Sequence, residues 1–218
     1  MPWYGLILNV YRENIMQIKI CGITNSDDGQ FAIEHGADYL GFIFYDKSPR
    51  YIDPNLLKEW IGELRGIKKV GVFVNKPIDD IISIVEICDL DVVQLHGEES
   101  DADIDKLKDF GVEIWRSFGL RSEEDVEEAA VCKADKILVD SISASEYGGT
   151  GKVCDWKLAS KLARKRDLIL AGGLNPDNVV EAIKEVQPFG IDVSSGVELI
   201  HGKKDLAKLE KFLKWGNI

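Results

Sequence analysis

Short apolar segments alternate with longer amphipathic segments along the whole chain. Nearly continuous apolar runs of this kind are typical of parallel strands that are buried on both faces. The segments rich in Val, Ile and Leu are QIKIC, DYLGFIF, KVGVFV, DVVQLH, VEIWRSF, KILVDS, DLILAGG and GIDVSS, at residues 17–21, 38–44, 69–74, 91–96, 112–118, 136–141, 167–173 and 190–195. The pattern therefore predicts eight buried strands.

The segments between these strands have the period of helices. Apolar side chains that recur every three or four residues fall on one face of a helix. In residues 101–110 this predicts an apolar face of Ile104, Leu107 and Phe110. Near the end of the chain it predicts a second such face, made of Leu206, Leu209, Phe212 and Leu213.

Strands that alternate with helices imply right-handed crossovers and a parallel sheet. Eight such units in about 200 residues, without a linker, match the small end of the size range of (β/α)8 barrels. An open doubly wound sheet is the alternative, but it usually has fewer strands and a G-x-G-x-x-G turn after the first. The sequence lacks that turn. We therefore predict the α/β class and a single-domain (β/α)8 TIM barrel over residues 16–218.

The first fifteen residues, MPWYGLILNVYRENI, stand outside this pattern. Their apolar patch has no preceding Lys or Arg, so it is a poor secretory signal. We interpret residues 1–15 as an N-terminal extension of uncertain status. It is either the product of a misassigned start upstream of Met16 or a segment that packs on the barrel or on a partner.

Charge and cysteine content restrict the partners and the location. The formal net charge is −11 and the sequence pI is about 4.8, which disfavours nucleic acid and anionic membrane surfaces as partners. Four widely separated cysteines and three histidines show no metal-ligand or disulfide spacing. No apolar run approaches the roughly 18–20 residues of a membrane span. We expect a cytoplasmic protein without a metal, either a monomer or a homodimer.

Two glycine-rich turns after consecutive strands indicate a phosphate site. In barrel enzymes the active site lies at the carboxyl ends of the strands, and phosphate is often held by the loops after strands seven and eight. Glycines allow backbone amides to approach a ligand, and a short helix opening there directs N–H groups inward. The candidate residues are Gly172, Gly173, Ser194, Ser195 and Gly196.

A third glycine-rich segment, EYGGTGK at residues 146–152, follows the sixth strand. It is not a nucleotide-binding P-loop, because Glu146 stands where the first Gly belongs and Val153 follows the Lys. We expect Gly149 and Gly151 to belong to a mobile loop that closes over the ligand and adds amides near its phosphate.

Three further side chains are predicted at the mouth of the barrel. Cys21 and Asp140 each end an apolar strand, and a thiol facing a carboxyl over an anchored substrate can act as a base and acid pair. For these roles the pKa of the thiol would have to be lowered and that of the carboxyl raised. Arg50 could grip a carboxylate with two parallel hydrogen bonds. For His96, a direct substrate role and a structural hydrogen-bonding role at the barrel rim both stay open.

The order and spacing of several motifs resemble the phosphoribosylanthranilate isomerase family. The motifs are KICGIT, GFIFYDKSPRYI, VGVFVN, QLHG, VDS with YGGTGK and DW, LAGGLNPDNV, and DVSSGVE with GKKD, and the match as a whole runs over about residues 19–214. The resemblance implies an Amadori rearrangement of N-(5′-phosphoribosyl)anthranilate to 1-(2-carboxyphenylamino)-1-deoxyribulose 5-phosphate in tryptophan biosynthesis, without metal or organic cofactor.

The resemblance also implies roles for individual residues. Cys21 resembles the general base that removes the proton from C2′, and Asp140 resembles the general acid that opens the furanose ring. Arg50 resembles the residue near the anthranilate carboxylate. The glycine-rich turns resemble the phosphate cradle of the family.

Other enzymes of phosphosugars on the same barrel are the alternative. They include an epimerase, indole-glycerol-phosphate synthase and an isomerase of histidine biosynthesis, since phosphate anchoring alone does not distinguish them. A metal-dependent epimerase would need paired His and Asp ligands, and the synthase would need catalytic Lys and Glu at strand ends. A non-catalytic phosphosugar-binding protein is a further hypothesis, which predicts binding without turnover.

Overall fold

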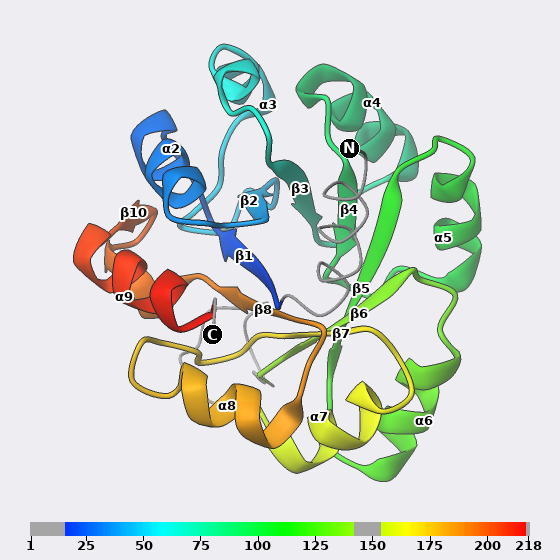
Figure 1. The fold of residues 1–218 in the computed structure, drawn as a ribbon. Coiled ribbons are helices and arrows are strands. Elements are labelled where there is room, and N and C mark those ends of the chain that lie inside the picture. Colours follow the sequence, from blue (N-terminus) through cyan, green and yellow to red (C-terminus); the bar gives the residue numbers. More distant parts are fainter. Residues whose placement is uncertain (1–15, 142–153, 217–218) are drawn as a thin grey trace, which may run out of the picture.

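The computed structural model describes residues 16–141 and 154–216. Eight parallel strands close into a barrel in chain order, and Figure 1 shows the helices arranged around the outside. The strands are β1 (Gln17–Cys21), β2 (Tyr39–Ile43), β3 (Lys68–Phe73), β4 (Val92–Leu95), β5 (Glu113–Gly119), β6 (Lys136–Asp140), β7 (Leu168–Leu170) and β8 (Gly190–Val193). This confirms the predicted fold class.

One α-helix follows each barrel strand. The helices are α2 (Ser26–Glu34), α3 (Pro54–Lys58), α4 (Ile78–Cys88), α5 (Asp101–Lys108), α6 (Glu123–Val131), α7 (Trp156–Ala163), α8 (Val179–Val186) and α9 (Leu206–Gly216). Polar side chains cap the N-termini of several helices by accepting hydrogen bonds from backbone amides that have no partner within the helix. Asp205 accepts in this way from the amides of Ala207 and Lys208.

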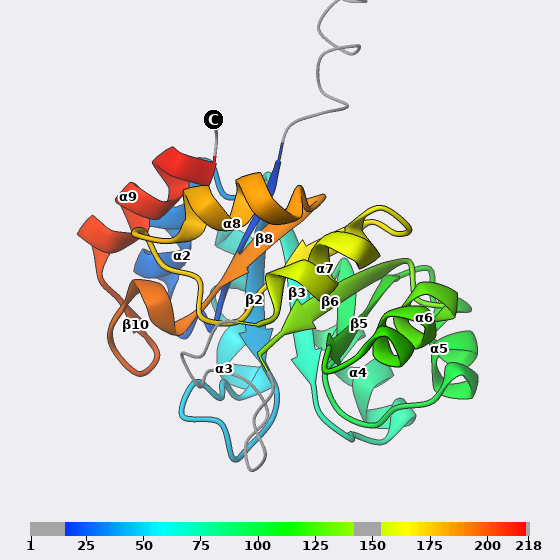
Figure 2. The ribbon, with the colours of Figure 1, turned by 90° about the horizontal axis from the view of Figure 1, so that it is seen from below.

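The segment between β8 and α9 contains a hairpin that the strand pattern did not predict. A 3₁₀ helix, Ser195–Val197, leads into the antiparallel strands β9 (Glu198–Ile200) and β10 (Lys203–Lys204). Gly202 has φ of +77° in the connecting turn. Another 3₁₀ helix, Ile61–Glu63, follows α3. In Figure 2, β10 and α3 lie at the same end of the molecule, so the hairpin stands beside the loops that follow the strands.

The interior of the barrel has an apolar layer and a polar layer. Successive side chains of a strand alternate between faces, so residues two apart both point inward. The apolar layer is packed from Tyr39, Val70, Val92, Trp115, Leu138 and Ile169. Two residues further along their strands stand Gln94 and Asp140, and these line a cavity. The apolar layer therefore closes the barrel beneath the polar ends of the strands.

The outer core lies between the strands and the helices. The burial of its side chains differs at one residue from each of the two predicted apolar helix faces. Ile104 and Leu107 of α5 are buried, but Phe110 lies beyond the last residue of that helix and is 50% exposed. In α9, Leu209, Phe212 and Leu213 are buried, whereas Leu206 is 44% exposed at the first position. Helical periodicity does not predict the exposure of Phe110 and Leu206, because these residues lie beyond or at the end of a helix, where its buried face does not continue.

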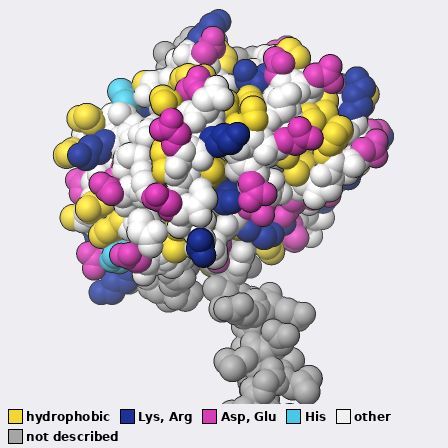
Figure 3. All heavy atoms as spheres, turned by 90° about the horizontal axis from the view of Figure 1, so that it is seen from above, with side chains coloured by type: hydrophobic (Ala, Val, Ile, Leu, Met, Phe, Trp, Pro, Cys, Tyr) yellow, Lys and Arg dark blue, Asp and Glu magenta, His cyan; other side chains and the backbone are white. Residues whose placement is uncertain are grey.

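Acidic and basic side chains are interspersed over the face of the molecule shown in Figure 3, and no patch of one sign dominates it. Mixed charge of this kind keeps a surface hydrated without forming a focused electrostatic field. Within the described residues, no helix has the length and apolar character needed to cross a bilayer.

Candidate active site

A cavity of about 510 Å³ opens at the carboxyl ends of the barrel strands. Most of the residues predicted for the site line it: Cys21, Arg50, Asp140, Gly172, Gly173, Ser194 and Ser195. Gly196 is not part of the lining, and the predicted loop residues Gly149 and Gly151 lie outside the described residues. The barrel thus gathers into one cavity residues that are up to 174 positions apart, since it brings Ser195 near Cys21.

The glycine behind Cys21 allows the thiol to lie in the cavity wall. Cys21 is the last residue of β1 and is 6% exposed. Gly22 follows with φ of +74°, and a Cβ there would lie 2.8 Å from Cδ of Arg50 and 3.0 Å from Oγ of Ser194. On β2, a Cβ on Gly41 would lie 2.9 Å from the Cys21 sulfur. Glycine is required at both neighbours because a larger residue would displace the thiol or Arg50.

An ion pair lies next to the thiol inside the barrel. Lys19 Nζ is 2.9 Å from Asp192 Oδ2, and the two side chains are 1% and 8% exposed. Lys19 precedes Cys21 by two residues on β1, so both side chains point inward, and the ammonium also forms a hydrogen bond with Cys21. Burial raises the pKa of the Cys21 thiol, and the nearby Lys19 charge offsets only part of this increase.

A chain of hydrogen bonds leads to Asp140. His96 Nε2 lies 3.4 Å from Asp140 Oδ2. The other ring nitrogen, Nδ1, lies 2.8 Å from Ser117 Oγ and 3.0 Å from Gln94 Nε2. Because the amide nitrogen of Gln94 can only donate, Nδ1 accepts, and the ring proton is on Nε2, directed at Asp140. His96 therefore orients the carboxyl at the cavity mouth.

The pKa of Asp140 reflects this environment. Burial alone would raise it, but the hydrogen bonds from His96 and from the amide of Ser141 outweigh burial and lower the pKa of Asp140. The sequence analysis required a lowered pKa for Cys21 as the base and a raised pKa for Asp140 as the acid. The structure shows the opposite shift at each residue. The reason is physical: burial dominates at Cys21, whereas hydrogen-bond donors dominate at Asp140.

Arg50 forms the predicted two-bond grip, but within the protein it holds Glu198. Its Nε and Nη2 atoms each donate to a carboxylate oxygen of Glu198 at 2.7 Å, and the two side chains are 7% and 5% exposed. Nη2 also lies 3.2 Å from Nδ1 of His201. The guanidinium still lines the cavity. Arg50 therefore reaches the cavity as a fixed group and not as a mobile surface arginine.

The turns after β7 and β8 pack closely against each other and against β6. Gly172 and Gly173 have φ of +79° and +68°. A Cβ on Gly172 would lie 2.5 Å from the amide nitrogen of Ser141, and one on Gly196 would lie 1.9 Å from the carbonyl oxygen of Leu174. Gly196 therefore lets the two turns approach each other, although it does not itself line the cavity.

Several polar atoms of the cavity wall lack a hydrogen-bond partner. Of the four such buried side-chain atoms in the described residues, three belong to residues that line the cavity: Gln94 Oε1, Asp192 Oδ1 and Ser194 Oγ. A buried polar atom without a partner costs roughly 1–3 kcal/mol, so native structures keep few of them. Their concentration in one cavity indicates that a polar ligand completes the site.

Comparison with known proteins decides the family. The family model described as N-(5′-phosphoribosyl)anthranilate (PRA) isomerase matches residues 18–215. The chain belongs to this isomerase family. The family membership confirms the resemblance seen in the motifs and the predicted isomerase activity of tryptophan biosynthesis.

Relatives and solved structures of the isomerase family agree over nearly the whole chain. The N-(5′-phosphoribosyl)anthranilate isomerase of Geotalea uraniireducens is 45% identical over 199 residues, which are 91% of this chain and 97% of the relative. That of Pelobacter propionicus is 40% identical over 201 residues, 92% of this chain and 95% of the relative.

Among solved structures, the isomerase from Thermotoga maritima has a TM-score of 0.86 at 40% identity and covers 92% of this chain and 98% of its own. A family structure in complex with reduced 1-(o-carboxyphenylamino)-1-deoxyribulose 5-phosphate has a TM-score of 0.83 at 39% identity, with the same coverage.

The sequence analysis of this isomerase-family chain missed several polar residues at the site. Lys19 and Asp192 interrupt apolar strands at inward positions, and a charged residue in such a strand was the signal that could have identified them. Glu198 and Lys204 lie within the quoted motifs DVSSGVE and GKKD, but nothing local indicated that they are buried. In the described parts of the chain, no three His, Cys, Asp or Glu side chains are grouped so that they could hold a metal ion.

Proposed function

We propose that the chain isomerises N-(5′-phosphoribosyl)anthranilate with Cys21 as general base and Asp140 as general acid. The observation that supports these roles most directly is that a thiol from β1 and a carboxyl from β6 line one cavity, together with Arg50 and the glycine turns. Two positioned groups of this kind typically accelerate each proton transfer by about 10²–10⁴-fold.

The reaction proceeds in three steps. Asp140 donates a proton to the furanose ring oxygen, the C1′–O bond breaks, and the nitrogen lone pair forms the C1′=N bond of a protonated Schiff base. The Cys21 thiolate then takes the proton from C2′, the C–H electrons form a C1′=C2′ bond, and the nitrogen recovers its electron pair. The resulting enolamine tautomerises to the ketone. Before the next turnover one proton leaves Cys21 and one returns to Asp140.

The substrate is anchored at both ends. We assign its phosphate to the backbone of the turns at Gly172, Gly173, Ser194 and Ser195, which Gly196 allows to pack together, and to the loop of Gly149 and Gly151. We assign its carboxylate to Arg50. Charge-assisted hydrogen bonds contribute roughly 1.5–3 kcal/mol each. Anchoring away from the reacting carbon then orients C2′ toward the base.

Turnover of freshly generated phosphoribosylanthranilate, followed by the loss of its anthranilate fluorescence, tests this function. We expect turnover that a chelator leaves unchanged, because no step uses a metal. The aminoaldose substrate of the histidine-pathway isomerase and a pentulose phosphate for epimerisation serve as competitors. Faster turnover of either one, with none of phosphoribosylanthranilate, would favour the alternative barrel enzymes instead.

The cellular location, partners, domain bounds and oligomeric state of the enzyme are predictions. We propose a cytoplasmic enzyme that binds a small molecule and no nucleic acid, with a barrel domain over residues 16–218 preceded by an extension over residues 1–15. A solved structure from Thermotoga maritima describes monomers generated from a dimeric isomerase, so a homodimer and a monomer are both kept. Sedimentation velocity over a range of concentrations distinguishes them.

A further inference from the structure

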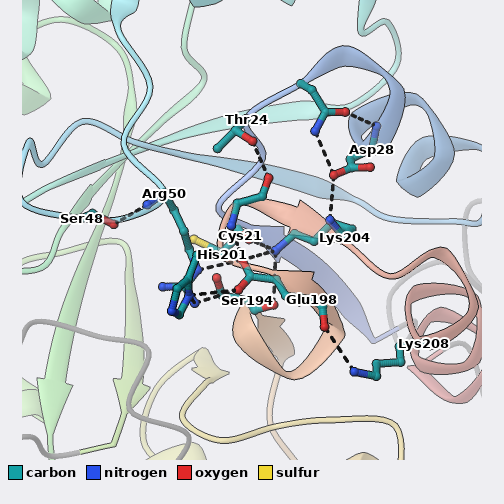
Figure 4. A network of polar contacts seen from close by, with 12 residues as sticks. Cys21, Thr24, Asp28, Ser48, Arg50, Ser194, Glu198, His201, Lys204 and Lys208 are labelled. Atoms are coloured by element: carbon teal, nitrogen blue, oxygen red, sulfur yellow. Dashed lines mark hydrogen bonds and ion pairs between the residues drawn. The ribbon is translucent and has the colours of Figure 1, made fainter.

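A buried ionic cluster adjoins the cavity between the β2–α3 loop and the β9–β10 hairpin (Figure 4). It consists of Arg50, Glu198 and Lys204, whose side chains are almost completely buried. A buried charge is retained only when its partners compensate the loss of hydration. The partners of each member therefore indicate what the cluster holds in place.

Lys204 joins the cluster to the end of β1. Its Nζ donates to the carbonyl oxygen of Cys21 at 2.7 Å and to that of Ser194 at 3.2 Å. The same ammonium lies 3.4 Å from Oε1 of Glu198. One cation thus connects the backbone of the proposed base, the turn after β8 and the carboxylate that holds Arg50.

Glu198 occupies only one edge of the guanidinium. It accepts from Nε and Nη2 of Arg50 at 2.7 Å each. Nη2 also lies 3.2 Å from Nδ1 of His201, whereas the described residues offer Nη1 no hydrogen-bond partner. Because guanidinium is planar and rigid, fixing the Nε edge also fixes the direction of Nη1. Arg50 lines the cavity, and Nη1 is the donor on its remaining edge that no described residue engages, so Nη1 is available to a ligand there.

We propose that Glu198 is a positioning residue, which holds Arg50 so that its free edge meets the carboxylate of the substrate. This inference rests on the proposed role of Arg50. A long side chain ordered in advance loses less conformational freedom when the ligand binds. The link through Lys204 sets the position of that edge relative to Cys21, so the carboxylate and the base are aligned by one cluster.

The test compares two substrates that differ only in the carboxylate. Phosphoribosylanthranilate carries it, and the analogue formed from aniline and ribose 5-phosphate lacks it. For Glu198→Gln we expect KM for phosphoribosylanthranilate to rise about 10-fold, as for the loss of one well-placed charged contact, with kcat changed less than about threefold. KM for the aniline analogue should stay unchanged.

A double-variant comparison shows whether Glu198 acts through Arg50. In an Arg50→Ala background, Glu198→Gln should have no further effect on KM, because residues that act through a common contact are not additive. Equal losses on both substrates, or additive losses in the double variant, would overturn the proposal. If Glu198→Gln does not fold, Glu198→Asp, which keeps the charge but shortens the side chain, replaces it with the same expectations.

Glu99→Gln is the matched control. Glu99 is a buried carboxylate 2.6 Å from Nη1 of Arg116, and neither residue lines the cavity. Its loss should change thermal stability but leave both KM values as in wild type. Wild type that fails to convert phosphoribosylanthranilate would refute the proposed function itself. Wild type that turns over, with an Arg50→Ala variant that keeps the wild-type preference for the substrate with the carboxylate, would refute the role of Arg50.

Discussion

Two sides of the cavity hold their polar side chains by different means. On the side of β8, β1 and β2, buried charges are paired. Lys19 contacts Asp192 at 2.9 Å, and both are almost fully buried. Arg50 is held by both oxygens of Glu198. We call this the ionic side of the cavity.

The side of β4, β5 and β6 uses hydrogen bonds between groups that carry little charge. His96 links Gln94 and Ser117 to Asp140, with Nδ1 accepting and Nε2 directed at the carboxyl. We call this the hydrogen-bonded side. Among the described residues, the one charged group of this side that lines the cavity is Asp140, the proposed acid.

The two sides of the cavity have different roles: one fixes the positions of side chains, and the other determines their protonation. Breaking a buried ion pair leaves an uncompensated charge, so the ionic side resists movement. Hydroxyl and imidazole groups can either donate or accept, so the hydrogen-bonded side can change its protonation with little displacement. In the proposed mechanism, the ionic side thus holds the base and the substrate carboxylate in place, and the hydrogen-bonded side sets the proton affinity of the acid.

The pKa directions at the two sides have a kinetic consequence. The proposed mechanism requires Cys21 as thiolate and Asp140 as acid, yet the pKa of Cys21 is raised and that of Asp140 is lowered. The productive form is then the minor one, and its fraction is constant between the two pKa values. We therefore expect kcat/KM to have a broad plateau, which falls below the pKa of Asp140 and above that of Cys21.

The largest effect is expected from removing either proton-transfer group. Cys21→Ala and Asp140→Asn should each lower kcat by about 10²–10⁴-fold, because each removes one proton transfer. Single-turnover kinetics with phosphoribosylanthranilate measure this, and circular dichroism establishes that both variants are folded. A variant that keeps more than a tenth of the wild-type kcat would exclude that residue from the acid and base pair.

Lys19→Met should weaken the ionic side. It leaves Asp192 as a buried charge without a partner, which typically destabilises a protein by about 3–5 kcal/mol. It also removes the cation that opposes burial at Cys21, so the alkaline limb of kcat/KM should move to higher pH. Urea unfolding and a pH profile measure the two effects. Lys19→Met with Asp192→Leu is the control and should recover stability, and an unchanged single variant would show that the pair contributes nothing.

His96→Asn should change the hydrogen-bonded side with a smaller effect on stability. Without the imidazole donor, burial dominates at Asp140 and its pKa rises. The acid limb of kcat/KM should therefore move to higher pH, while the alkaline limb stays in place. The measurement is kcat/KM over the pH range in which both proteins remain folded. An acid limb at the wild-type position would mean that His96 does not control Asp140.

The smallest effect is expected from removing residues 1–15. The family match starts at residue 18, and among the residues that the structure describes neither side of the cavity includes one before Lys19. A chain that starts at Met16 should keep kcat and KM and change the free energy of unfolding by less than about 0.5 kcal/mol. Reduced activity or altered sedimentation would instead favour a segment that packs on the barrel or on a partner.

The sequence by itself was sufficient for the architecture and for the chemically distinctive residues. Apolar runs reveal strands because burial on both faces of a parallel sheet selects the same residue types locally. Cys21 and Asp140 could be identified because each ends such a run, and the ends of barrel strands form the catalytic face. The hairpin of β9 and β10 was missed because its strands are three and two residues long and carry no apolar run.

Only the tertiary structure decided which buried charges pair and how the site is tuned. Lys19 and Asp192 are 173 positions apart and meet because barrel closure places β8 beside β1. Arg50 and Glu198 are 148 positions apart, so the sequence did not show that they meet. Arg50, which was expected to bind a ligand carboxylate, is bound on one edge by Glu198. A pKa depends on burial and on neighbours in space. The sequence alone therefore could not predict whether the pKa of Cys21 and that of Asp140 are raised or lowered. It showed only which direction the proposed chemistry would need.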